Sequence, residues 1–122
     1  MAAENSLQTL GGHVAGEDLN EYRGVIKQDP DQVALPSSKG DHIRGVTQNA
    51  PNNGEAATLG IEGITKMEYG EDVNSGATEL TVGANGKAVI ADSNDEILGT
   101  SHNGGFSSGS VGAVDLEYRG TK

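Results

Sequence analysis

The stretch that decides the fold is Gly54-Glu-Ala-Ala-Thr-Leu-Gly-Ile-Glu-Gly-Ile-Thr-Lys-Met-Glu-Tyr69. Every second residue in it belongs to a mostly apolar set, which consists of Ala57, Leu59, Ile61, Gly63, Thr65, Met67 and Tyr69. The residues between them are mostly polar, namely Thr58, Gly60, Glu62, Ile64, Lys66 and Glu68. A period of two is typical of a strand with one buried face and one face in water. We therefore predict that the core of the main strand is formed by Leu59, Ile61, Met67 and Tyr69.

Two glycines lie inside this pattern. Gly60 and Gly63 fall within a segment that is much longer than a common strand of about 5 or 6 residues. Glycine inside a strand often marks a bulge or a bend. We therefore expect two strand segments that share one inward face, and the rest of the chain has to supply their partner strands.

The flanking sequence predicts further short strands and no long helix. We expect these strands at residues 21–28, 32–35, 43–48, 79–82, 88–91, 96–100 and 111–118. Asn85-Gly86 is typical of a type I′ hairpin turn, because that turn needs a positive φ at both central positions. Many short strands at close spacing favour an all-β fold, here a compact β-barrel or β-sandwich that forms a single domain over residues 21–122.

Residues 1–20 show no steady hydrophobic period, and Gly11, Gly12 and Gly16 would break a helix. We expect an extended N-terminal arm here. One interpretation is a frayed terminus. The other is a segment that becomes ordered on a partner's surface. In the second case the contacting residues are Leu7, Leu10, His13 and Val14, with the loop at residues 70–76 as a further candidate.

The composition restricts the class of protein. With 122 residues, 19 glycines and only 3% aromatic residues, the chain can build a single thin core, so we expect it to gain stability by oligomerisation. A net charge of −10 disfavours binding to nucleic acid, because phosphates would be repelled. No apolar run approaches the roughly 18 residues that would suggest a membrane-spanning helix. There are 0 cysteines, so no disulfide or thiolate chemistry is expected.

The residues that could carry chemistry are scattered. His13, His42 and His102 lie far apart and lack the spacing of a metal site, so we expect each of them at the surface or in a loop. The segment 92–96 imitates the start of an EF-hand loop, but Ile97 stands where that loop needs glycine. The segment 107–110 lacks a nucleophile elbow. We therefore predict neither a metal site nor a cofactor nor catalysis.

Several segments, in order and at the right spacing, resemble the head decoration proteins of tailed bacteriophages, which are also called capsid cement or stabilising proteins. The resemblance extends over residues 21–118. It rests on Ile43-Arg-Gly-Val-Thr-Gln-Asn-Ala-Pro51, Gly54-Glu-Ala-Ala-Thr58, Gly63-Ile-Thr-Lys66, Gly83-Ala-Asn-Gly-Lys-Ala-Val89 and Ile97-Leu-Gly99.

This resemblance implies a small, tulip-like β domain with a structural role and no enzyme activity. It implies a homotrimer on the outer surface of the expanded capsid of the virion, at local three-fold axes, made in the host cytoplasm. Its partners would be the major capsid protein and other copies of itself, and it would cement neighbouring capsid subunits. The alternative is a non-catalytic module that binds carbohydrate or another ligand, although the chain offers few aromatic residues for such a site.

Overall fold

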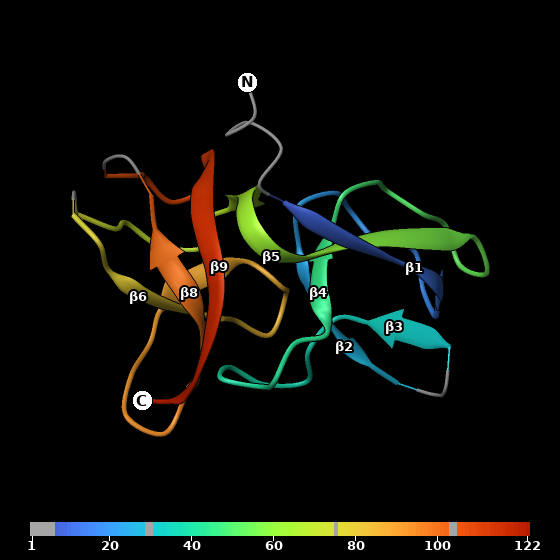
Figure 1. Cartoon of the computed structure of the whole chain (residues 1–122), viewed down its shortest axis with the longest axis horizontal. Coiled ribbons are helices and arrows are strands. Elements are labelled where there is room, and N and C mark those ends of the chain that lie inside the picture. The colour runs from blue at the N-terminus through green and yellow to red at the C-terminus, as the bar shows by residue number, and fades with distance from the viewer. Residues whose placement is uncertain (1–6, 29–30, 75, 103–104) are drawn as a thin grey trace.

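The alternating stretch forms one long strand, β5 (Ala56–Glu68), and every other strand is arranged around it in this computed structural model (Figure 1). The structure describes residues 7–28, 31–74, 76–102 and 105–122. The two segments expected from the sequence are thus one continuous strand. Its first half pairs with β1 (Gln8–Ala15) and β4 (Gly45–Thr47), and its second half pairs with β9 (Val111–Thr121).

The described residues form nine strands and no helix, so the predicted all-β class is confirmed. Accordingly, no helix in the described part of the chain could cross a membrane. The strand order in the sheet is β1-β3-β2-β4-β5-β9-β8-β6-β7. The remaining strands are β2 (Gly24–Lys27), β3 (Gln32–Ala34), β6 (Glu79–Val82), β7 (Ala88–Ile90) and β8 (Glu96–Ser101).

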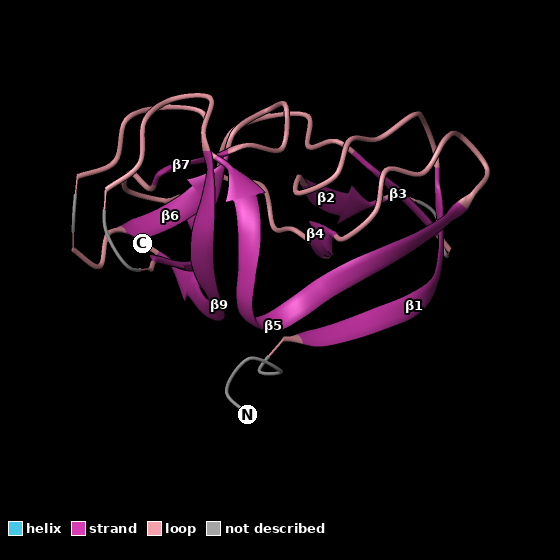
Figure 2. Ribbon diagram, turned by 90° about the horizontal axis from the view of Figure 1, so that it is seen from above, coloured by secondary structure: helices cyan, strands magenta, loops and turns pink. Residues whose placement is uncertain are grey.

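The first half of β5 belongs to a closed barrel. The strands run β1-β3-β2-β4-β5, and a direct pairing of β1 with β5 closes the circle. The second half of β5 belongs to a similar unit of β5, β9, β8, β6 and β7, which is closed by a bridge between Tyr69 and Ala88. We call these units the first and second barrels. Figure 2 shows them on either side of β5.

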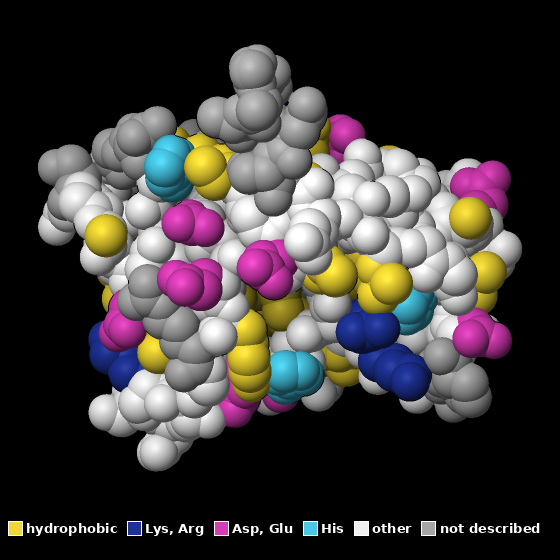
Figure 3. Space-filling view, in the orientation of Figure 1, with side chains coloured by type: hydrophobic (Ala, Val, Ile, Leu, Met, Phe, Trp, Pro, Cys, Tyr) yellow, Lys and Arg dark blue, Asp and Glu magenta, His cyan; other side chains and the backbone are white. Residues whose placement is uncertain are grey.

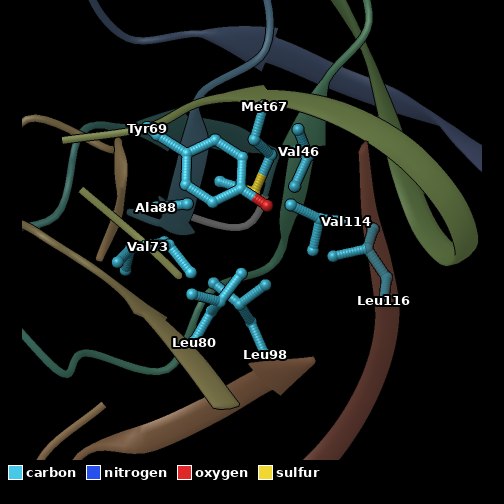
Figure 4. Packing of buried hydrophobic residues seen from close by; sticks show 10 residues of the cluster. Val46, Met67, Tyr69, Val73, Leu80, Ala88, Leu98, Val114 and Leu116 are labelled. Atoms are coloured by element: carbon cyan, nitrogen blue, oxygen red, sulfur yellow. The ribbon is translucent and has the colours of Figure 1, made fainter. Parts of the chain in front are cut away.

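Each barrel has its own core, and β5 contributes to both. The first core includes Ala57 and Leu59 of β5 together with Ala15, Leu19, Val25 and Val33. Met67 belongs to the second core, as does Tyr69 just after the strand (Figure 4). The other buried members of the second core are Val46, Val73, Leu80, Val82, Ala88, Leu98, Val114 and Leu116.

The prediction that Ile61 is a core residue is wrong, whereas Leu59, Met67 and Tyr69 are fully buried. Ile61 is 37% exposed, and its neighbour Gly60 is buried instead. The alternation breaks where β5 leaves one barrel and enters the other. Gly63 adopts a φ of 102° there, which L-residues with a side chain rarely adopt. The buried parts of β5 in the two barrels are therefore joined by a bend, at which Ile61 turns outward.

The segment expected as an N-terminal arm supplies a strand. Residues 8–15 form β1, which pairs with β5 and, in parallel, with β3. Further along, Leu19 is 4% exposed and packs in the first core. Residues 1–6 of the expected arm lie outside the described part of the chain. The hydrophobic period is hidden because β1 is bulged between Leu10 and His13, where two glycines intervene.

The hairpin between β6 and β7 forms as predicted, but its turn is not type I′. The Gly86 N–H donates to the Gly83 carbonyl at 2.9 Å, and the Gly83 N–H donates to the Lys87 carbonyl at 2.9 Å. Gly86 has a φ of 81°, whereas Asn85 is not among the residues with positive φ. This is the longer loop in which a turn is followed by one left-handed residue, usually glycine.

A stacked pair of aromatic rings fills the second core. The rings of Tyr69 and Phe106 lie 4.5 Å apart at an angle of 22°, and the Tyr69 hydroxyl donates to the Ala113 carbonyl at 2.9 Å. Burial raises the pKa of this hydroxyl to about 12. A Cβ on Gly112 would lie 2.2 Å from the Phe106 ring, so glycine is required there for the stack to form.

An ion cluster ties the two barrels together at the end of β5. The Glu68 carboxylate pairs with Arg23, which precedes β2, at 2.9 Å and with Lys87 of the β6–β7 loop at 3.1 Å. Partial burial by itself would raise the pKa of Glu68. The hydrogen bonds and positive charges of Arg23 and Lys87 outweigh that effect and hold the pKa below its ordinary value.

The first prediction tests the two faces of β5. Leu59→Ala should lower the free energy of unfolding by about 2 to 5 kcal/mol, because it leaves a cavity in the first core. Ile61→Ala should cost less than about 1 kcal/mol, because Ile61 lies outside both cores. Urea unfolding measures both values. Equal losses for the two variants would contradict the assignment of Ile61 to the surface.

The second prediction concerns the charge of Glu68. Glu68→Gln should cost about 1 to 2 kcal/mol at pH 7, because it weakens two charged hydrogen bonds. A lowered pKa in the folded state means that this stabilisation is complete above the ordinary pKa of 4.5 and is lost as the pH falls through the folded-state pKa. Unfolding curves of the wild type and the variant should therefore converge in acid.

Glu62→Gln is the matched control for this experiment, because Glu62 is an exposed acid of the same strand. It should have little effect at any pH. A Glu68→Gln deficit that stayed constant from pH 7 to pH 2.5 would show that the charge is not its source.

Candidate interaction surface

The side chains that could carry chemistry are dispersed in the structure. Among the described residues, no group of three or more His, Cys, Asp or Glu side chains could hold a metal ion. The segment 92–96, which imitates an EF-hand in sequence, begins with a tight turn in which the Asp92 N–H donates to the Asp95 carboxylate at 2.9 Å. His42 and His102 lie on loops, but His13 lies in β1 and is only 8% exposed, which corrects its expected surface position. We therefore look for a functional site among the surfaces of the protein that could bind a partner.

The four residues predicted to contact a partner lie at the start of the first barrel. Leu7 is partly buried against the second core, Leu10 is half-buried in β1 opposite Leu59, and Val14 is half-buried beside Gln32 of β3. His13 donates from Nδ1 to the Gly11 carbonyl at 3.1 Å and accepts the Arg44 Nε–H at Nε2, 3.3 Å away. All four residues thus make contacts within the fold, and their contact with a partner stays a prediction.

The loop at residues 70–76, the other predicted contact, is held down by the second barrel. The Glu71 carboxylate accepts the Ile90 N–H at 2.7 Å, and Val73 is 2% exposed and bridges to Phe106. Asp72 accepts the Ser108 N–H at 2.8 Å. These contacts give the described residues of the loop a structural role.

A cleft runs between the two barrels, and we call it the inter-barrel cleft. Its narrow part, of about 240 Å³, is lined by Ile61 and by residues from three other places: the segment that leads into β4, the middle of β8 and the second half of β9. The lining residues there are His42, Ile43, Arg44, Gly45, Gly60, Ile61, Leu98, Leu116 and Tyr118. The cleft widens toward Ile26, Lys27 and Asp41. Figure 3 shows the hollowed face, with two basic side chains together on one side.

One wall of the inter-barrel cleft is apolar and partly exposed. Tyr118 is 50% exposed, and its ring meets the ring of His42 edge to face at 4.6 Å. The Tyr118 hydroxyl lies 2.6 Å from His42 Nδ1, which is also 3.3 Å from a carboxylate oxygen of Glu96. These contacts hold the Tyr118 ring in place in the part of the cleft that Ile61 also lines.

The opposite wall carries positive charge without a matching acid. Neither Lys27 nor Arg44 forms an ion pair within the described part of the chain, and Arg44 is held instead by His13. By contrast, most of the other described basic side chains pair with carboxylates, namely Arg23, Lys39, Lys87 and Lys122.

Asp41 lies near these cations, but its carboxylate is already occupied. Desolvation by itself would raise the pKa of Asp41. The N–H and hydroxyl groups of Ser37 and Ser38, which donate to the carboxylate, outweigh that effect and lower the pKa. Asp41 thus stays ionised, and the two cations Lys27 and Arg44 against this one carboxylate leave the widened part of the cleft with an excess of positive charge.

The sequence did not reveal this cleft. Lys27 and Arg44 are 17 positions apart, and in sequence they are two of the scattered bases. They come together because β2 and β4 pair antiparallel with Val25 opposite Gly45. Ile61 was assigned to the core because its position in the alternation is apolar. Finding the paired cations or the exposed Ile61 would have required knowledge of which strands pair and in which register.

Comparison with known proteins identifies the fold. The sequence matches no family model and no curated protein. Among solved structures, the chain is similar to the N base of the head fiber protein gp8.5 of bacteriophage phi29, with a TM-score of 0.71 and 16% sequence identity. The match covers 95% of this chain and 98% of that chain. The chain therefore has the fold of a phage head protein, which agrees with the resemblance of its sequence to head decoration proteins.

Proposed function

We propose that this chain is a structural protein of a phage virion that binds the outer surface of the expanded capsid and cements neighbouring major capsid subunits. The observation that carries the proposal is the fold, which it shares along nearly its whole length with the base of a phage head fiber. The sequence motifs of head decoration proteins, found at independent positions, support the same function. In this role the protein needs no catalysis, no cofactor, no nucleic acid and no membrane.

The closure of both barrels supports binding through side chains more than through strand addition. A partner strand needs an edge with unpaired N–H and C=O groups. In the described structure both halves of β5 have partners, the bridge from Tyr69 to Ala88 links β5 to β7, and the Ile90 N–H is occupied by Glu71. The surface therefore offers exposed apolar side chains, which are Ile61, Ile64, Val111 and Tyr118.

A homotrimer at local three-fold axes gives weak contacts a large effect. A ring of three copies repeats one interface and engages three shell sites at once, so the attachment strengthens without any single strong contact. Since the protein would bind the assembled shell and not its separated subunits, its binding free energy adds to the stability of the shell. Ile64 and Val111 lie on the outward side of the paired strands β5 and β9, and we propose this face for the contact between copies.

The alternative, a carbohydrate-binding module, has less support. Such sites rely on aromatic rings that can stack on sugars. Tyr69 and Phe106 stack on each other in the second core, and among the described aromatic residues Tyr118 is the one that is more than a third exposed.

The third prediction tests attachment to the capsid. Purified protein should co-sediment with expanded heads of the phage that encodes it, should raise the temperature at which those heads break open, and should not bind unexpanded heads. Cryo-electron microscopy of the decorated heads should show three copies around each occupied axis. Heads that open at the same temperature with and without saturating protein would contradict a cementing function.

The contact between copies is tested with Ile64→Asp, which places a charge on the proposed interface. The variant should weaken head binding and shift the mass in analytical ultracentrifugation toward the monomer, with little change in unfolding free energy because Ile64 is exposed. Thr58→Asp, on the exposed side of β5 within the first barrel, is the matched control and should bind like the wild type.

A further inference from the structure

The inter-barrel cleft has the chemistry of a binding site for an acidic polypeptide segment. We propose that it takes an extended segment of the capsid subunit that carries carboxylates and one apolar side chain. The carboxylates would pair with Lys27 and Arg44, and the apolar side chain would lie against Ile61 and Tyr118. This inference rests on the proposed function, and it names the chemistry by which the protein would recognise the shell.

The charge argument begins with the rarity of cations in this chain. The chain has 8 Lys and Arg against 18 Asp and Glu, so a basic side chain can readily find an acid within the fold. Most of the described bases do so. Lys27 and Arg44 do not, and both line the widening of the same cleft. Two positive charges that line one cleft, neither of them in an ion pair among the described residues, favour a partner that supplies carboxylates. A guanidinium can hold a carboxylate by two parallel hydrogen bonds.

The geometry keeps Arg44 available for such a partner. Its Nε–H donates to His13 Nε2 at 3.3 Å, and its backbone N–H donates to the Val25 carbonyl at 2.7 Å. Those bonds fix the backbone and the stem of the side chain, and the two terminal nitrogens of the guanidinium make no hydrogen bond or ion pair with the described residues. Since the side chain is already held in position, little rotamer entropy remains to be lost when a ligand binds.

The apolar wall explains why we expect a polypeptide rather than a free anion. Ile61 and Tyr118, both partly exposed, line the narrow part of the cleft together with the buried Leu98 and Leu116. A free anion would leave this apolar surface in water. One apolar side chain between the carboxylates of an extended segment would cover it, and removing this apolar surface from water favours binding.

The test uses the full chain and a defined probe. A synthetic peptide of alternating aspartate and leucine residues is titrated into ¹⁵N-labelled protein, and a peptide of alternating lysine and leucine serves as the comparison. The acidic peptide should shift the amide signals of His42, Arg44, Gly45 and Ile61. The Lys27→Gln/Arg44→Gln double variant should lose at least about tenfold in affinity, and Lys27→Gln by itself a smaller factor.

Lys66→Gln is the matched control for this test. Lys66 is an exposed lysine of β5 that also lacks an ion pair among the described residues, but it lies outside the cleft. Its substitution should leave the affinity unchanged. The single variant Lys27→Gln guards against a folding defect. Because Lys27 is exposed, its substitution tests the charge even if the loss of Arg44 disturbs His13.

Equal shifts with the lysine peptide, or shifts away from the cleft, would overturn the proposal. The same shifts on raising the protein concentration without peptide would assign the cleft to a second copy and would also overturn it.

Binding to expanded heads separates this inference from the proposed function. If the wild type binds heads and the double variant binds them at least tenfold more weakly, the cleft carries the attachment. If both bind equally, the function stands and the cleft inference fails. If the wild type does not bind heads, the proposed function fails, and with it the identity of the partner as a capsid subunit.

Discussion

The structure depends on one strand that serves two barrels. The hydrogen bonds of β5 go to β1 and β4 in its first half and to β9 in its second half, and its buried side chains enter two separate cores. Neither core is large, because the chain has 3% aromatic residues. A small core buries too little apolar surface for a barrel to be stable by itself. Joining both cores through one continuous backbone, with the Glu68 cluster across its end, lets each barrel stabilise the other.

The main features of this arrangement could be predicted from the sequence, and the misses have physical causes. The alternation in β5 identified Leu59, Met67 and Tyr69 as core residues because both barrels bury the same side of the strand. It misplaced Ile61 because a bend between the barrels interrupts the pattern without changing its phase, and two glycines indicate a bend without giving its direction. The strand β1 was missed because its bulge destroys the period of two.

The candidate site was less accessible to sequence reasoning than the fold. The inter-barrel cleft exists because β5 bends at Gly63, and its charge exists because β2 and β4 bring Lys27 beside Arg44. The pairing of β2 with β4 is long-range, so no local pattern encodes it, and the glycines that predict the bend do not give its direction. The same bend that turns Ile61 out of the core places it on the wall of the cleft. The device that joins the barrels therefore also shapes the surface proposed to meet the capsid.

Native-state hydrogen exchange in increasing denaturant tests the shared strand most directly. It reports the free energy of opening for amides of β3 in the first barrel and of β6 in the second barrel separately. If β5 makes one cooperative unit of the two barrels, both sets of amides should converge on the same opening free energy and the same denaturant dependence. The contrary result would be that the β3 amides open with a smaller denaturant dependence while the β6 amides stay protected. The barrels would then unfold independently, which would contradict this account.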